Sequence, residues 1–182
     1  MTRDPLTWFE AWFPSNTLLQ GLEAALATAS SEGAPAVRMV LVKAADERGF
    51  TFYTSYESRK GRELAANPRA ALLFRAPARQ VRVEGRVERV PVEESDAYWA
   101  SRPAASRRSA AASRQSQPVA SRAALEAAVA RQPEEPPRPS SWGGYRLVPD
   151  RFEFWEHRED RLHDRLRYRR DGETWTAERL QP

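Results

Sequence analysis

The sequence predicts one α+β domain, residues 1–182, built mainly on an antiparallel sheet or barrel. Strand-like runs lie on both sides of a helical stretch, the arrangement of a single mixed domain. The chain has 182 residues, of which 41% are hydrophobic and 10% aromatic, enough to form a real core. Val81, Val83 and Val87 alternate with charged residues, as in a strand with one buried face. The chain contains no internal repeat.

Local signals in the first half predict a helix followed by a hairpin. Asp4 before Pro5 is typical of a helix start, and this helix should end near Pro14. Residues 22–30 are ambiguous, because their alanines favour a helix and their position favours a strand. Residues 37–43 and 50–55 are expected to form a hairpin around the DERG turn.

The second half alternates further strands with helical and irregular segments. A short helix is expected at 58–66, capped by Ser58 and ended by Asn67 and Pro68. Strands at 70–74 and 80–90, helices at 93–101 and 121–130, and three or four antiparallel strands from Trp142 onward complete the expected elements. The segment 101–122 carries five arginines and no acid and is expected to be mobile, and the proline-rich residues 131–141 should form an arm.

Composition excludes several kinds of site. The chain has no cysteine, which excludes disulfides and thiolate metal ligands, and only two histidines, so no metal site is expected. With no long apolar run and no signal sequence, the chain is expected to be cytoplasmic, without a membrane segment. Of 29 basic residues, all but Lys43 and Lys60 are arginine. Codon bias toward arginine is one interpretation of that excess, and the two lysines are then candidates for sites that need a compact ammonium group.

Two candidate site groups carry charge on predicted strands. Arg161, His163 and Arg165 would share one strand face, which suits either an anion site or a solvent-exposed edge equally well. Arg38 and Lys43 are five residues apart and should lie on opposite faces, so both could meet ligands only if the ligands lie on different sides or the strand ends are twisted. Two charges that bracket a buried strand are the alternative interpretation.

Two further groups lie on predicted helices. Ser58, Arg59 and Lys60 stand at a helix N-terminus, where amide groups and cations suit a phosphate, although an ordinary solvated helix start has the same composition. Tyr98 and Arg102 are four residues apart on one expected helix face, with Ser106 nearby, as in many amphipathic helix ends. Together the four groups supply two separate cationic clusters. No glycine-rich dinucleotide or P-loop motif is present.

Several longer motifs occur in order along the chain: DPLTWFEAW, VRMVLVK, FYTS, SRKGRELAANPRAALLF, RQVRVEG, SRP, RQSQPVASRAALEAAV, WGGYR, FEFW and RLHDRLRY. They resemble successive motifs of the pyridoxamine 5′-phosphate oxidases, from about Asp4 to Pro182. The resemblance implies an FMN-binding split β-barrel with peripheral helices, working as a homodimer with the flavin between subunits. It also implies oxidation of pyridoxine or pyridoxamine 5′-phosphate to pyridoxal 5′-phosphate, with O2 reduced to H2O2.

The resemblance assigns roles to individual residues. The implied FMN contacts are Arg38, Met39, Val40, Leu41, Val42, Lys43, Tyr53, Thr54, Arg59, Lys60, Gln80, Gln115, Ser116, Trp142 and Arg165. The implied contacts to the substrate phosphate are Lys43, Tyr98, Arg102 and Ser106. Arg161 and His163 match the pair beside the substrate ring, and so they are the implied catalytic residues.

Departures from the family pattern lie on the substrate side. Only three residues precede Asp4, where the family usually has an arm, and Pro14 breaks a helix that usually continues. Ala104, Ala105, Ser109 and Ala111 replace residues usual in the family. A related flavin oxidase acting on another ring, such as a dihydro-phenazine, therefore stays an alternative, as does a non-catalytic flavin- or pyridoxal-phosphate-binding protein. Nucleic-acid binding through 101–122 is not favoured, because that segment lacks interleaved aromatics.

Overall fold

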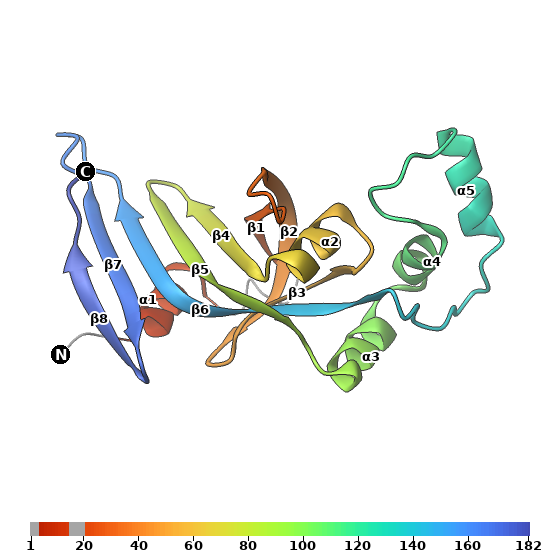
Figure 1. Cartoon of the computed structure of the whole chain (residues 1–182), viewed down its shortest axis with the longest axis horizontal. Helices are drawn as coiled ribbons and strands as arrows, with labels where there is room; N and C mark the ends of the chain where they lie inside the picture. Colours follow the sequence, from red (N-terminus) through yellow and green to blue (C-terminus); the bar gives the residue numbers. More distant parts are fainter. Residues whose placement is uncertain (1–3, 15–20) are drawn as a thin grey trace.

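The computed structural model describes residues 4–14 and 21–182 and contains a closed antiparallel barrel with two more strands on one edge (Figure 1). The strand order is β3-β2-β1-β4-β5-β6-β7-β8, and β3 also pairs with β6, so the first six strands close the barrel. The strands are β1 Leu22–Ala29, β2 Pro35–Asp46, β3 Gly49–Ser55, β4 Arg69–Ala76, β5 Arg79–Arg89, β6 Trp142–Glu156, β7 Asp164–Asp171 and β8 Thr174–Arg179.

The 15-residue strand β6 belongs to both parts of the sheet. Its residues 142–147 pair with β3 and close the barrel, whereas its residues 151–156 pair with β7. A register shift in β5 between Glu84 and Gly85 lets β5 follow β6 along both halves. A Cβ on Gly85 would lie 2.0 Å from the Val148 carbonyl oxygen, so this close approach requires glycine. The two ends of β6 therefore lie far apart, as Figure 1 shows.

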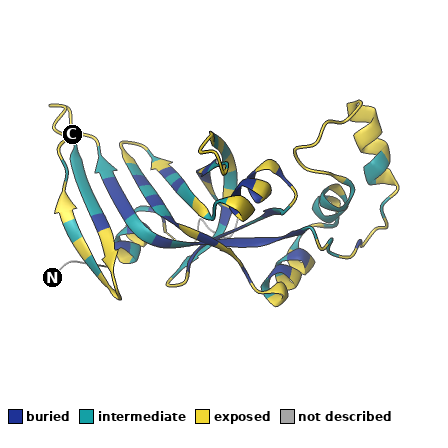
Figure 2. Ribbon diagram, in the orientation of Figure 1, coloured by how far each residue is buried: buried dark blue, intermediate teal, exposed yellow. Residues whose placement is uncertain are grey.

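Aromatic side chains fill the barrel interior and join it to α1 (Pro5–Trp12). Asp4 caps this helix by accepting a hydrogen bond from the Leu6 amide, as its sequence predicts. Phe9 is fully buried, with its ring centroid 4.9 Å from Phe50 and 4.8 Å from Phe74. Burial is concentrated along the barrel strands, and α5 is mostly exposed (Figure 2). Helix α1 is therefore anchored to the core by the buried Phe9 and by the partly buried Trp8 and Trp12.

Residues 101–122, which the sequence predicts to be mobile, contain a helix in the structure. Helix α3 (Val92–Ser101) is followed by a second helix, α4 (Ala104–Ala112), and then α5 (Arg122–Ala130). Alanine has the highest helix propensity, so the alanine-rich run folds once Pro103 has set its start. Arg108 of α4 donates to the Val129 carbonyl of α5 at 3.3 Å, which ties the two helices together. Residues 131–141 form the expected arm without a helix.

The other expected elements are confirmed, and the ambiguous one is resolved. Residues 22–29 form β1, because pairing with β2 on one edge and β4 on the other outweighs the helix propensity of their alanines. The hairpin of β2 and β3 turns at Asp46–Gly49, and α2 (Arg59–Ala66) is capped by Ser58 and Asn67. Three strands follow Trp142. Across the described ranges, no helix combines the length and apolar character needed to cross a bilayer.

Candidate functional site

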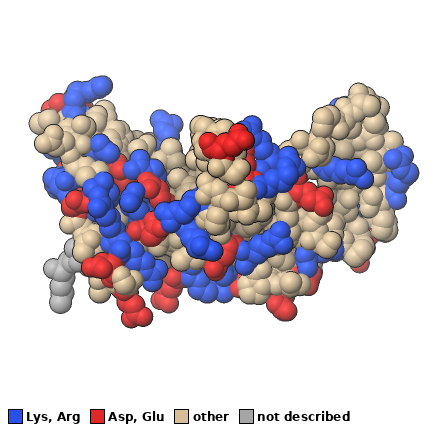
Figure 3. All heavy atoms as spheres, in the orientation of Figure 1, with Lys and Arg blue, Asp and Glu red and all other residues tan. Residues whose placement is uncertain are grey.

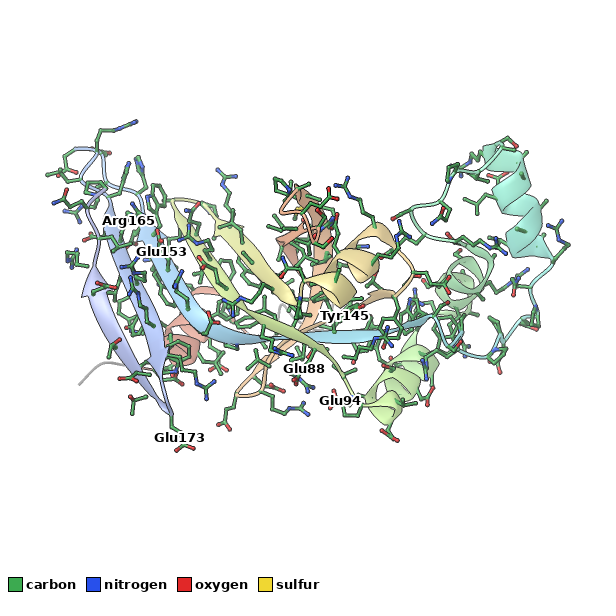
Figure 4. The ribbon with its side chains drawn as sticks, viewed as in Figure 1. Glu88, Glu94, Tyr145, Glu153, Arg165 and Glu173 are labelled. Carbon is green, nitrogen blue, oxygen red and sulfur yellow. The ribbon has the colours of Figure 1, made fainter. Side chains whose placement is uncertain are left out.

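Expected site residues lie in a pocket near the start of β6, around Glu63, and near the end of β6, where Figure 4 labels Arg165. The pocket group lies near the start of β6 and consists of Lys43, Tyr53, Thr54, Tyr98, Arg102, Ser106, Gln115 and Trp142, which line one pocket of about 980 Å³. The β7 group lies near the end of β6 and consists of the expected residues Gln80, Arg161, His163 and Arg165, together with Trp155, which was not expected.

The pocket group contains all four residues expected to hold a substrate phosphate. Tyr98 and Arg102 do not share one helix face, contrary to the prediction from their spacing. Helix α3 ends at Ser101, and Arg102 is its C-cap with an extended backbone, φ −75° and ψ 147°. Tyr98 belongs to α3 and Ser106 to α4, while Lys43 comes from β2. The four side chains meet because α3, α4 and the barrel border one pocket.

A column of stacked rings forms one wall of the pocket. The ring centroids of Tyr53 and Tyr98 are 3.9 Å apart, and the planes of Tyr98 and Trp142 differ by only 6°. The Arg102 guanidinium lies over Trp142, 4.7 Å from its centroid. A Cβ on Gly144 would come within 2.8 Å of the Tyr53 ring, so glycine at this position lets the ring lie flat against β6.

The electrostatics of Arg102 and Lys43 suit an anion. Burial lowers the pKa of Arg102. Burial and then the positive charge of Arg102 lower the pKa of Lys43. The Nη1 atom of Arg102 is buried and has no hydrogen-bond partner among the described residues. A buried guanidinium nitrogen without a partner, beside a like charge, is stabilised when an anion binds.

A second cationic cluster surrounds Glu63 behind the pocket. The buried Glu63 carboxylate accepts hydrogen bonds from Arg59 Nε at 2.8 Å, Arg38 Nη2 at 3.1 Å and Thr28 Oγ1 at 2.5 Å. Burial alone would raise the pKa of Glu63, but these hydrogen bonds, with the charge of Arg38, bring it below its ordinary value. The carboxylate therefore stays ionised and orients both arginines.

Lys60 completes this second cluster. Its buried Nζ donates to Thr54 Oγ1 at 3.1 Å and to Gln115 Oε1 at 3.2 Å. Burial, and then the charge of Arg38, lower the pKa of Lys60 to about 8, against a smaller opposing effect of Glu63. Among the described residues, three cations thus adjoin one carboxylate. A phosphate dianion would balance the positive charge that remains.

The two faces of β2 separate Arg38 from Lys43, as their spacing predicts. Lys43 lines the pocket, whereas Arg38 reaches Glu63 on the other side. Val42 is fully buried, so this residue could offer a ligand only its backbone. Val37, Met39 and Leu41 form an exposed apolar row on the face of Lys43, with 70%, 61% and 46% exposure.

The prediction that Arg161, His163 and Arg165 share one strand face is wrong. Strands β6 and β7 are antiparallel neighbours, so the chain must reverse between them, and it does so over residues 157–163. Arg161 lies in this turn with φ 66°, and β7 begins only at Asp164. Of the three residues, Arg165 alone is on the strand.

A network of ion pairs holds Arg165 on the outer face of β5, β6 and β7. Arg165 donates from Nε and Nη2 to one oxygen of the buried Glu153, at 2.9 and 2.7 Å (Figure 4). Arg82 donates to the other Glu153 oxygen at 2.6 Å. Figure 3 shows acidic and basic side chains interleaved over this end of the molecule. The Arg165 guanidinium is therefore fixed before any ligand binds.

Sequence reasoning missed Trp155. In the strand register Trp155 lies directly between Gln80 of β5 and Arg165 of β7, and its ring centroid is 4.7 Å from that of His163. The alternation of FEFW could have indicated it, because Phe152 and Phe154 are buried and Trp155 must face the other way. Trp142, which the resemblance places among the FMN contacts, lines the pocket together with Lys43, Tyr53, Thr54 and Gln115.

The described residues contain no cluster of histidine and acidic side chains that could hold a metal ion. Known proteins resemble the chain over most of its length. Residues 16–132 match the family model of pyridoxamine 5′-phosphate oxidase, and residues 142–182 match that of the pyridoxine 5′-phosphate oxidase C-terminal dimerisation region.

Relatives of known name and structure agree with these matches. A pyridoxine/pyridoxamine 5′-phosphate oxidase of Bordetella petrii is 56% identical over 98% of this chain and 89% of its own length. One from Burkholderia lata is 53% identical over 100% and 91%. The crystal structure of PhzG from Burkholderia lata 383, in complex with tetrahydrophenazine-1-carboxylic acid, has a TM-score of 0.91 at 34% identity, covering 100% of this chain and 94% of that one. An FMN binding protein related to pyridoxamine 5′-phosphate oxidase, from Nostoc punctiforme, has the same fold, with a TM-score of 0.79 at 21% identity over 100% of both chains.

Proposed function

The chain belongs to the pyridoxamine 5′-phosphate oxidase family and is an oxidoreductase, and we propose that it uses FMN to oxidise pyridoxine or pyridoxamine 5′-phosphate to pyridoxal 5′-phosphate while O2 is reduced to H2O2. One observation carries this proposal. The structure has two separate cationic clusters, around Lys60 and around Arg102, as a phosphorylated cofactor and a phosphorylated substrate would require.

The cluster of Arg38, Arg59 and Lys60 suits the phosphate of FMN. Its three cations adjoin the single carboxylate of Glu63, and a phosphate dianion would balance the remaining charge. Bound FMN would supply the redox chemistry by accepting a hydride equivalent and passing electrons to oxygen. The implied contacts of Thr54, Gln115 and the backbone of β2 lie beside this cluster.

The pocket group would hold the substrate phosphate and orient its ring. Arg102 and Lys43 provide the charge, and Tyr98 and Ser106 provide hydroxyl groups that can donate hydrogen bonds. Two phosphate anchors, one for the substrate and one for the cofactor, would fix the two rings relative to each other and remove orientational freedom from the transfer step.

A homodimer would bring the two groups of site residues together. Trp142 and Trp155 stand near opposite ends of β6, 13 residues apart, roughly 40 Å along an extended strand, so one chain does not place both around one ligand. The match to a dimerisation region and the exposed row of Val37, Met39 and Leu41 support a second copy at this site. The β7 group of that copy would then complete the pocket of this one.

A second candidate substrate is a reduced phenazine. The 34% identity to PhzG, whose structure contains tetrahydrophenazine-1-carboxylic acid, favours this alternative. The identities of 56% and 53% to pyridoxine/pyridoxamine 5′-phosphate oxidases favour the vitamin B6 compounds.

An aerobic assay with each substrate separates the two. The FMN-loaded protein should produce equal amounts of H2O2 and of an aldehyde chromophore from pyridoxine 5′-phosphate. Turnover of a dihydro-phenazine without turnover of either vitamin B6 phosphate would overturn the proposed substrate. A protein that cannot be loaded with FMN would overturn the whole proposal.

A further inference from the structure

The orientation of His163 is set by a backbone amide. The Arg158 N–H donates to His163 Nδ1 at 3.1 Å. A neutral imidazole has one acceptor nitrogen and one donor nitrogen, so a ring that accepts at Nδ1 carries its proton at Nε2. We infer that the turn between β6 and β7 holds His163 as the Nε2–H tautomer, so that His163 donates a hydrogen bond to an acceptor on the substrate ring and does not take the substrate's proton. This inference rests on the proposed function.

Hydrogen bonds within the turn position the Arg158 amide. The Arg161 amide donates to the Arg158 carbonyl at 3.2 Å, and the Leu162 amide donates to Asp160 Oδ1 at 3.0 Å. Arg161 closes the turn in the left-handed region, with φ 66°. A non-glycine residue in this region is uncommon and persists only where its surroundings hold it. The conformation of the turn thus aligns the Arg158 N–H with the ring that follows.

The imidazole is also fixed from its other side. Its centroid lies 4.7 Å from the Trp155 ring, with the planes tilted by 49°, and 5.2 Å from the ring of His157. His163 is half-buried, whereas Arg161 and His157 are exposed. With the ring packed against Trp155 and Nδ1 engaged by the amide, Nε2 is the nitrogen left to meet a ligand.

The charged groups in and beside this turn are largely paired with one another. Asp164 is paired with Arg158 and Arg179, and Arg165 is paired with the buried Glu153. A proton at Nδ1 would occupy the position to which the Arg158 N–H now donates, so it would displace that hydrogen bond.

The assignment has a consequence for the reaction. When the exocyclic carbon of the substrate loses a hydride to the flavin, the attached oxygen or nitrogen must also lose a proton to form the aldehyde or imine. His163 already carries a proton at Nε2 and accepts a bond at Nδ1, so it takes no part in that proton transfer. The proton leaves to solvent water, and His163 stabilises charge on the ring instead.

Nuclear magnetic resonance tests the tautomer without any activity. The chain has only two histidines, so ¹⁵N-histidine labelling together with the His157→Gln variant assigns both rings. The spectrum should show His163 protonated at Nε2 and not at Nδ1, with and without FMN. Arg158→Pro removes the amide N–H and should give a mixture of tautomers, whereas Arg158→Ala keeps that N–H and should leave the spectrum unchanged. An Nδ1–H tautomer in the native chain, or an unchanged spectrum in Arg158→Pro, would overturn the assignment.

Anaerobic flavin reduction by pyridoxine 5′-phosphate tests the role. Glutamine can place an N–H near the position of Nε2, so His163→Gln should keep the rate within about tenfold, while His163→Leu should lose about a hundredfold or more. Equal losses in both variants would mean that His163 acts as the base. If the native enzyme itself were not reduced while the tautomer was the one expected, the proposed substrate would fail and the tautomer assignment would stand.

Discussion

Replacing Lys60 by methionine should separate its cost to folding from its value for cofactor binding. The buried environment lowers the pKa of Lys60 from 10.5 to about 8. Each pKa unit corresponds to about 1.4 kcal/mol, so holding the ammonium charged in the folded protein costs at most about 3.5 kcal/mol, or about 2 kcal/mol after allowance for solvent screening. Methionine has a similar length and no charge, so Lys60→Met should stabilise the FMN-free protein by up to that amount.

The same shift predicts a dependence on pH. Because the folded-state pKa is the lower one, the folded protein binds fewer protons than the unfolded chain between about pH 8 and 10.5. The free energy of unfolding should therefore rise with pH across this window in the FMN-free native protein, by about 2 kcal/mol, relative to Lys60→Met. The destabilising contribution is fully present below pH 8. Denaturant unfolding of both proteins, at several pH values, measures the difference.

Cofactor binding should respond in the opposite direction. A phosphate pairs with the protonated amine, so Lys60→Met should weaken FMN binding by about 10- to 100-fold, the value of one charge-assisted bond. Quenching of flavin fluorescence measures the dissociation constant, and in the native protein the affinity should fall as pH rises above about 8. Arg62→Met removes an exposed cation two residues away on α2 and should change neither quantity. If Lys60→Met left the FMN affinity unchanged, or destabilised the FMN-free protein as much as a core truncation, the cationic cluster would be a structural feature and not a cofactor site.

Three further outcomes follow from the geometry. Arg102→Leu and Lys43→Met should each raise KM for pyridoxine 5′-phosphate by tenfold or more, with FMN still bound, because they remove cations from the pocket. Steady-state kinetics measure KM, and an unchanged KM in both variants would contradict this prediction. Met39→Glu should place charge in the exposed apolar row and dissociate the dimer, measured by light scattering, and a dimer of native affinity would refute that interface. Gly144→Ala should press a methyl group against Val90 and the Tyr53 ring, lower the free energy of unfolding by about 1–3 kcal/mol in denaturant and disturb the pocket, whereas native stability would show that both side chains can move aside.

Local signals predicted the elements whose residues interact mainly with their sequence neighbours. Ser58 and Asn67 bound α2 as expected, and Asp4 caps α1. Such caps depend on hydrogen bonds within a few residues, so the sequence alone is sufficient to recognise them. The long-range properties of the chain required the structure. Residues 22–29 became a strand only because two neighbouring strands pair with them.

The candidate site shows the same limit. The spacing of Arg38 and Lys43 placed them correctly on two faces, because β2 pairs regularly with β1 over residues 35–42 and its register with β3 shifts only beyond Val42. The same argument failed for Arg161 and His163, where a reversal of the chain replaces the strand. Trp155 was missed because its importance comes from its cross-strand neighbours. The alternation of FEFW indicates only that Trp155 faces away from the core, and the strand register does not follow from it.

The length of β6 has a consequence for inheritance and for engineering. In the proposed dimer, each active site takes its pocket group from one chain and its β7 group from the other. A chain that has lost Arg102 and a chain that has lost Arg165 would each be impaired alone. Mixed together, they would form hybrid dimers in which one site combines both lesions and the other combines none. Two defective alleles could therefore restore each other's activity, up to half of that of the native enzyme in each hybrid, because a single strand carries the two halves of the site to different places.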